Sequence, residues 1–121
     1  MAILFLLTTL ASVSLLAIGV MALLGRLPRN HFAGIRTHRT LASDEAWYHA
    51  HRVGSAPTIF GSVAALAIGL ALLPFVIAGE IGDGLATTIL IGQVVLLGGG
   101  ATLSWLVADR AAQPGANNVP G

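Results

Sequence analysis

Residues 30–54 read NHFAGIRTHRTLASDEAWYHAHRVG, and they are the one long polar stretch in a chain of 121 residues that is otherwise mostly apolar. Three of the six arginines lie in this stretch, two more, Arg26 and Arg29, lead into it, and all four histidines are inside it. The stretch therefore separates an apolar segment before it from a longer apolar segment after it. The fold must leave this stretch in contact with water while both flanks avoid water.

The composition of the chain assigns it to the membrane. Hydrophobic residues make up 55% of the sequence and charged residues 9%, and the mean hydropathy is +0.85. A soluble domain of this size carries far more charge on its surface. The absence of cysteine excludes disulfides and thiolate metal sites. We expect an all-α integral membrane bundle that forms one transmembrane domain over residues 1–110.

Three apolar runs are long enough to cross a bilayer. The predicted spans cover about residues 2–25, 58–78 and 85–107. A secretory signal peptide is a competing interpretation of the first run, but no Lys or Arg precedes it and it is too long for the apolar part of a signal peptide. Gly25 and Pro28 are expected to end the first helix. Residues 111–121 are polar and rich in Pro and Asn, and are expected to be a disordered tail.

The segment between the first two spans, residues 26–54, predicts a cytoplasmic loop that ends in a short amphipathic helix. Ser43 is the expected N-cap, and Asp44 and Glu45 complement the helix dipole. One face of this helix carries Trp47, Ala50, His51 and Gly54, and the other carries Glu45, Tyr48, His49 and Arg52. The helix either lies in the membrane interface or docks against the ends of the spans. Gly54, Ser55 and Pro57 predict a break before the second span.

Small residues predict where the spans pack together, because close helix contact in lipid requires short side chains. The second span carries Gly61, Ala65 and Gly69 at intervals of four, and the third carries Gly100 and Ser104. In the first span, Thr8, Ser12 and Gly19 lie near one face, with hydroxyls that either support helix contact or bond to their own helix carbonyls. Gln93, the one strongly polar side chain at depth, is expected to bond to a neighbouring helix.

The arginine placement predicts the orientation, since cytoplasmic loops are enriched in Lys and Arg. Residues 26–54 are therefore expected inside. This places the N-terminus and the acidic turn at Glu80 and Asp83 outside, and Arg110 and the C-terminus in the cytoplasm.

Few kinds of chemistry fit the polar stretch. His49 and His51 point away from each other on a helix, and Glu45 with His49 supplies only two possible ligands, so no metal is predicted. No nucleophile motif or phosphate-binding glycine loop is present, so no enzyme activity and no cofactor are expected. The basic segment is short and faces a membrane, which argues against nucleic-acid binding. Arg36 and Arg39 could bind anionic lipid head groups, or act only as topology signals.

The pattern N-x3-G-I-R-T-x2-T-L-x-S-x-E-x-W-x2-A-H-R-x-G in residues 30–54 resembles the segment that marks the SdpI family of small bacterial membrane proteins. The motif residues are Asn30, Gly34, Arg36, Thr37, Thr40, Leu41, Ser43, Glu45, Trp47, His51, Arg52 and Gly54. The resemblance implies a plasma-membrane protein for immunity or signalling against a secreted toxic peptide. The namesake of the family, which has more spans, also passes on a signal by holding a transcriptional repressor at the membrane.

Three short spans with small-residue faces also suit a second hypothesis, an accessory subunit of a larger transporter or respiratory assembly. Under either hypothesis the expected partners are membrane lipids and other membrane helices, as a homo-oligomer or a larger complex.

Overall fold

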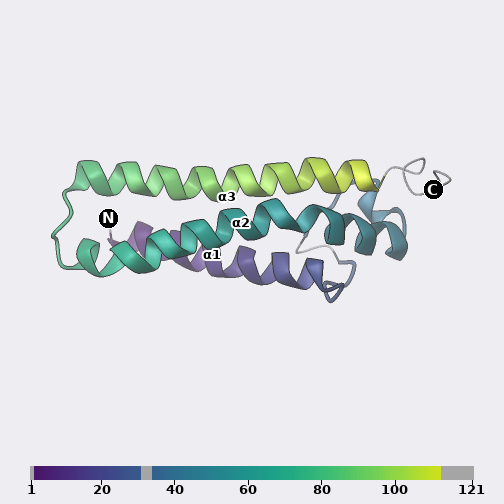
Figure 1. Cartoon of the computed structure of the whole chain (residues 1–121), viewed down its shortest axis with the longest axis horizontal. Helices are drawn as coiled ribbons and strands as arrows, with labels where there is room; N and C mark the ends of the chain where they lie inside the picture. Colours follow the sequence, from purple (N-terminus) through teal and green to yellow (C-terminus); the bar gives the residue numbers. More distant parts are fainter. Residues whose placement is uncertain (1, 31–33, 113–121) are drawn as a thin grey trace.

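The computed structural model describes residues 2–30 and 34–112. Three long α-helices account for most of it: α1 (Ala2–Leu23), α2 (Asp44–Ile77) and α3 (Asp83–Ala111), with a short 3-10 helix, η1 (Thr40–Ala42), before α2 (Figure 1). Each long helix is apolar and long enough to cross a membrane, and the described residues contain no strand. The prediction of an all-α, three-span membrane protein is confirmed.

Helix α2 is the centre of the bundle. It packs along both α1 and α3, whereas α1 and α3 make little contact with each other. The start of α1 and the connection between α2 and α3 lie at one end of the molecule. The arginine-rich segment, residues 26–43, lies in its described part (26–30 and 34–43) at the other end, beside the last turn of α3 (Figure 1). The six arginines therefore share one end, and Glu80 and Asp83 share the opposite end.

Helix α1 forms and ends as its sequence predicts. The hydroxyls of Thr8 and Ser12 donate to the carbonyls of Leu4 and Thr8 at 2.8 and 2.9 Å, so these two side chains satisfy themselves within their own helix. Gly25 has a φ of +70° and the N–H of Arg26 bonds to the carbonyl of Met21 at 2.8 Å. This glycine-dependent closure caps the helix at its C-terminus.

The prediction of a separate interfacial helix between the first two spans is wrong. Residues 44–77 form one continuous helix of 34 residues, about 51 Å long by the rise of an α-helix. The hydrocarbon core of a bilayer is only about 30 Å thick. The predicted amphipathic segment is therefore the first part of α2, and it extends out of the membrane at the arginine-rich end.

Pro57 lies inside α2 because α3 supplies a hydrogen-bond partner next to it. A proline inside a helix removes one backbone bond and disturbs the preceding turn. Here the N–H of Thr58 donates to Ser104 Oγ at 3.0 Å, and Thr58 Oγ1 bonds to the same oxygen at 2.6 Å. Neighbouring helices commonly re-satisfy the backbone beside a membrane proline in this way.

Gly54 is a helix-contact residue and not a helix break. A Cβ added to Gly54 would lie 2.8 Å from the Cβ of Ala108 and 3.0 Å from the Ser104 carbonyl oxygen. The absence of a side chain therefore lets α2 approach the last turns of α3. Packing against α3 outweighs the low helix propensity of glycine at this position.

The small residues of α2 and α3 bring the two backbones close together. A Cβ on Gly61 would lie 2.5 Å from the Leu96 carbonyl oxygen, and one on Gly100 would lie 2.6 Å from the Pro57 carbonyl oxygen. Farther along, Gln93 Nε2 donates to the carbonyl of Ala65 at 2.9 Å. The expected bond from Gln93 to a neighbouring helix is thus present.

Helix α1 joins this packing at Gly69, where a Cβ would meet the hydroxyl of Thr9 and the amide of Gln93. The predicted small-residue positions of α2 and α3 therefore lie at helix contacts. In α1, Ser12 and Gly19 are buried as the pattern suggests, whereas Thr8 is only partly buried and Thr9 is the buried threonine.

The end of α3 extends farther than the sequence suggests. Ala111 is the last residue of the helix and Ala112 follows as its C-cap. Ala112 packs with Ala46, Ala50 and Ala108 in a small apolar cluster. The predicted disordered tail therefore starts too early, and its residues 113–121 lie outside the described residues.

Candidate functional site

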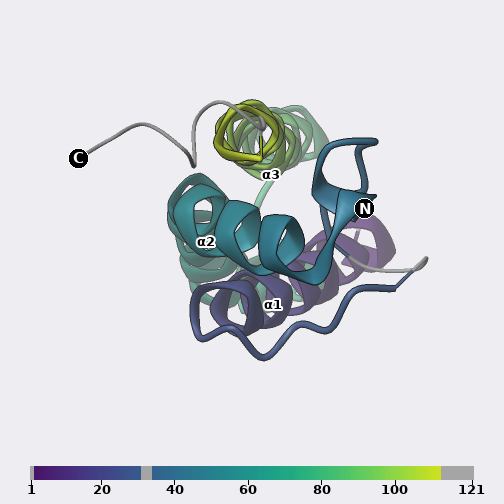
Figure 2. The ribbon, with the colours of Figure 1, turned by 90° about the vertical axis from the view of Figure 1, so that its right-hand side faces the viewer.

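The arginine-rich segment folds back onto the end of the helix bundle. We call residues 34–43 the docked loop. It runs along the side of α2 between the ends of α1 and α3 (Figure 2). His51 bonds this loop to α2, Trp47 belongs to the cluster against which its Leu41 packs, and Thr40 fixes its internal shape.

Trp47 anchors the start of α2 to the end of α1. Its side chain has no exposed surface and packs with Ala22 and Leu27. Its indole Nε1–H donates to the carbonyl of Leu27 at 2.7 Å. The predicted apolar face of this segment is therefore correct, and Trp47 on this face contacts protein.

His51 fixes the docked loop through both ring nitrogens. Its Nδ1 lies 2.8 Å from the carbonyl of Trp47, and its Nε2 accepts a hydrogen bond from the N–H of Ile35 at 2.8 Å. A carbonyl can only accept and a backbone N–H can only donate. The geometry therefore specifies the neutral ring with its proton on Nδ1.

Gly34 allows this approach. Its φ is +101°, and a Cβ there would lie 2.8 Å from His51 Nε2. Both the left-handed backbone and the lack of space favour glycine at this position.

Thr37 and Thr40 set the shape of the docked loop around Arg36. The N–H of Thr37 donates to Thr40 Oγ1 at 2.8 Å, and the N–H of Thr40 donates to Thr37 Oγ1 at 3.1 Å. Thr40 Oγ1 also donates to the carbonyl of Ile35 at 2.8 Å. Backbone bonds on both sides of Arg36 thus hold its Cα in place while its side chain is exposed.

Two ion pairs tie other arginines to the helices. Arg29 Nε lies 3.1 Å from an oxygen of Asp44, and Arg39 Nη1 lies 3.1 Å from an oxygen of Asp109 in α3. Exposed pairs of this kind contribute little to stability. The second pair nevertheless connects the docked loop to α3.

Most of the remaining motif residues have local structural roles. Ser43 is the N-cap of α2 and accepts from the N–H of Ala46 at 3.0 Å, as predicted. Asn30 Nδ2 donates to the carbonyl of Pro28 at 2.6 Å. Leu41 packs against the Trp47 cluster. Glu45 and Arg52 are exposed, and the Arg52 guanidinium lies over Gly25, 3.3 Å from where a Cβ would stand.

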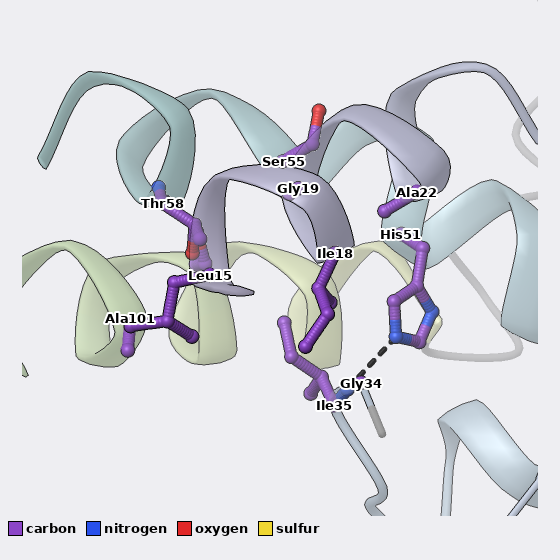
Figure 3. A pocket seen from close by; sticks show the side chains of 12 residues that line it. Leu15, Ile18, Gly19, Ala22, Gly34, Ile35, His51, Ser55, Thr58 and Ala101 are labelled. Carbon is purple, nitrogen blue, oxygen red and sulfur yellow. Dashed lines mark hydrogen bonds between the residues drawn. The ribbon is translucent and has the colours of Figure 1, made fainter. Parts of the chain in front are cut away.

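Beneath the docked loop lies a cavity of about 140 Å³ (Figure 3). All three helices and the loop line it. The motif residues Gly34, His51 and Gly54 are among its walls. No three His, Cys, Asp or Glu side chains gather into a possible metal site in residues 2–30 and 34–112.

Some partners of the site were not predicted from the sequence. The backbone groups of Leu27 and Ile35 carry no sequence signal, because any residue has a carbonyl and most have an N–H. Ser104 was predicted only as a small packing residue. The proline at position 57 is the signal that could have suggested a hydroxyl partner on another helix.

The neutral state of His51 predicts a pH-dependent loop. His51 belongs to the part of α2 that extends beyond the hydrocarbon, and burial lowers its pKa below the usual 6.5, although the bond to Trp47 acts in the opposite direction. The folded protein then binds fewer protons than the unfolded chain. The contribution of His51 to the free energy of unfolding is therefore fully present above pH 6.5. It is lost as the pH falls from there through the lowered pKa of the folded state.

We therefore expect amide hydrogen exchange in residues 34–43 to speed up as the pH falls from 7.5 to about 5, after correction for intrinsic exchange rates. Protonated Nε2 would present a donor to the Ile35 N–H, which removes the bond. His51→Gln should abolish this pH dependence, and His49→Gln should keep it. A pH dependence that survives in His51→Gln would refute this role.

A model of the SdpI/YfhL protein family matches residues 26–108. The match covers the arginine-rich segment, all of α2 and most of α3, and it excludes α1. No curated protein and no solved structure matches the chain.

Proposed function

The chain belongs to the SdpI/YfhL protein family, and from this membership we propose that it is a non-enzymatic bacterial membrane protein for immunity or signalling against a secreted toxic peptide. The docked loop is its working surface. In this proposal the loop contacts an anionic group through Arg36, and that group is a lipid phosphate, a carboxylate of a partner protein or Glu45.

The observation that supports this proposal is the fixed backbone on both sides of Arg36. Ile35 is bonded to His51 and Thr40, and Thr37 is bonded to Thr40. A residue whose backbone is already fixed loses less freedom on binding, and its guanidinium can hold two oxygens at once. An arginine needed only for topology would not require such support.

The proposed orientation places the docked loop in the cytoplasm, the N-terminus outside and the C-terminus inside. Its support is that all six arginines gather at one end of the bundle, while Glu80 and Asp83 occupy the other. Arg36 and Arg39 would then face the anionic head groups of the inner leaflet.

Replacing Arg36 with lysine tests the proposal. We expect Arg36→Lys to insert correctly and to lose most of the phenotype that the intact gene provides, such as resistance to the toxic peptide, because an ammonium cannot replace a two-oxygen contact. Arg110→Lys, at the end of α3, is the matched control and should keep full function.

Orientation is measured on intact cells with an impermeant thiol reagent. A cysteine at Asp83 should react and one at His38 should not. Full function in both Arg36→Lys and Arg36→Ala would refute the role of the docked loop, and reversed labelling would refute the orientation.

A second candidate function is an accessory subunit of a larger membrane complex. It is supported by α3, where Gly92, Gly98 and Gly99 are exposed and a Cβ at each would meet nothing within 4 Å. Another helix could approach closely there.

Copurification from native membranes distinguishes the two candidate functions. A large stoichiometric partner supports the accessory subunit, and a solitary protein or homo-oligomer with toxin-linked expression supports immunity.

A further inference from the structure

The cavity beneath the docked loop has apolar walls from two helices that barely touch each other. Leu15, Ile18 and Ala22 of α1 form one wall and Ala101 of α3 contributes to the other. Its volume of about 140 Å³ is close to that of apolar protein cavities of about 150 Å³ that stay dry and take up benzene. The space is therefore large enough for a segment of hydrocarbon.

The polar groups around the cavity already have protein partners. Thr58 Oγ1 bonds to Ser104 Oγ at 2.6 Å, and Ser55 Oγ donates to the carbonyl of Arg52 at 3.2 Å. His51 uses both nitrogens on backbone groups. A guest would find no unsatisfied polar atom among these groups, so the lining favours an apolar guest over water or a polar ligand.

The surroundings of the cavity favour a lipid chain as the guest. Outside the cavity, α1 and α3 present exposed apolar side chains such as Val13, Val20 and Leu103, as expected of helices that face lipid. The docked loop covers the cavity at the arginine-rich end, where Gly34 and Ile35 line it (Figure 3). Arg26 and Arg52 are exposed at that same end, where they complement the charge of a phosphate head group.

We propose that the cavity between α1, α2 and α3 is a binding site for one acyl chain of a phospholipid. The chain enters sideways from the bilayer between α1 and α3, and the docked loop closes the site at the membrane surface. This site does not depend on the proposed immunity function, and it would exist equally in a subunit of a larger complex.

Trp47 offers a direct test because it has no exposed surface and packs behind His51 and Gly34, which line the cavity. Its ring centroid lies 4.1 Å from that of His51, and a Cβ on Gly34 would lie 3.1 Å from its Cη2. In a Trp105→Phe background, Trp47 is the one tryptophan left. We expect its fluorescence to be quenched in phosphatidylglycerol vesicles whose acyl chains carry bromine, relative to unbrominated vesicles.

Filling the cavity should remove this quenching. Ala101→Leu adds volume to the α3 wall and should reduce the quenching of Trp47 by about half or more, because the chain is displaced. Thr102→Leu, the next residue and exposed, is the control and should leave quenching unchanged. Circular dichroism checks that each variant keeps its helix content, and Leu15→Phe on the α1 wall replaces Ala101→Leu if that variant does not fold.

An unquenched Trp47 in the parent protein would overturn the proposal, as would equal quenching in the parent and in a folded cavity-filling variant. Equal quenching would mean that ordinary surrounding lipid reaches Trp47 from outside. Loss of quenching in the filled variant alone supports the site.

Discussion

Trp47→Ala should destabilise the protein by about 3–5 kcal/mol, the usual loss for a large aromatic side chain removed from a packed site. Trp47 is fully buried, and its loss would leave a cavity beside Ala22 and Leu27 and the carbonyl of Leu27 without its donor. Thermal unfolding in detergent measures the loss. Limited proteolysis should show the arginine-rich segment detaching from α2 first.

Trp105→Ala is the control, since Trp105 is 46% exposed on α3 and its removal should change stability little. Trp47→Phe keeps a six-membered aromatic ring but removes the N–H together with part of the indole. It should cost at least about 1–3 kcal/mol, which is usual when one buried carbonyl loses its partner. If Trp47→Ala unfolds at the same temperature as Trp105→Ala, the docking of the start of α2 against the end of α1 is refuted.

Gly61→Ala should destabilise the bundle by about 1–3 kcal/mol although it adds a single carbon atom. That carbon would lie 2.5 Å from the Leu96 carbonyl oxygen, and a backbone oxygen cannot move aside as the end of a flexible side chain can. The helices α2 and α3 would have to separate. The thermal unfolding temperature and the dispersion of methyl NMR signals report this change.

Gly92→Ala is the matched control on α3. A Cβ there would meet nothing within 4 Å, so the substitution should be neutral or stabilise the helix by up to about 1 kcal/mol. Equal effects of the two substitutions would mean that Gly61 faces lipid and that the close contact between α2 and α3 is absent.

The spans were predictable because their signals are local or periodic. An uncharged run as long as Met1–Gly25 fits only a membrane, Ser43 marks a helix start by its own hydroxyl, and the four-residue spacing of Gly61, Ala65 and Gly69 defines one face. Gly54 and Pro57 led to the wrong prediction of a separate helix, because both residue types commonly mark a helix break. Their meaning depends on Ser104 and Ala108, which are about fifty residues away in sequence.

The candidate site was predictable only in part for a related reason. The periodicity of Trp47, Ala50, His51 and Gly54 identified the apolar face, but a helical period cannot say whether that face meets lipid or protein. The answer lies in the Leu27 carbonyl and the Ile35 N–H, which are backbone groups common to nearly all residues. The docked loop and the cavity beneath it therefore required the three-dimensional arrangement.

The uninterrupted length of α2 has a mechanical consequence. Because one continuous helix of 34 residues carries both the membrane span and the residues that hold the docked loop, a movement of the span is passed on to the outer part of the helix through Pro57, where the helix lacks one backbone bond. A change of tilt in the bilayer, for instance in response to local thickness, would move this outer part. The backbone beside Arg36 is bonded to α2 through His51, and Arg39 is paired with Asp109 of α3. A tilt of α2 relative to α3 would therefore shear the arginine-rich surface and turn a deformation of the membrane into a rearrangement of its charges.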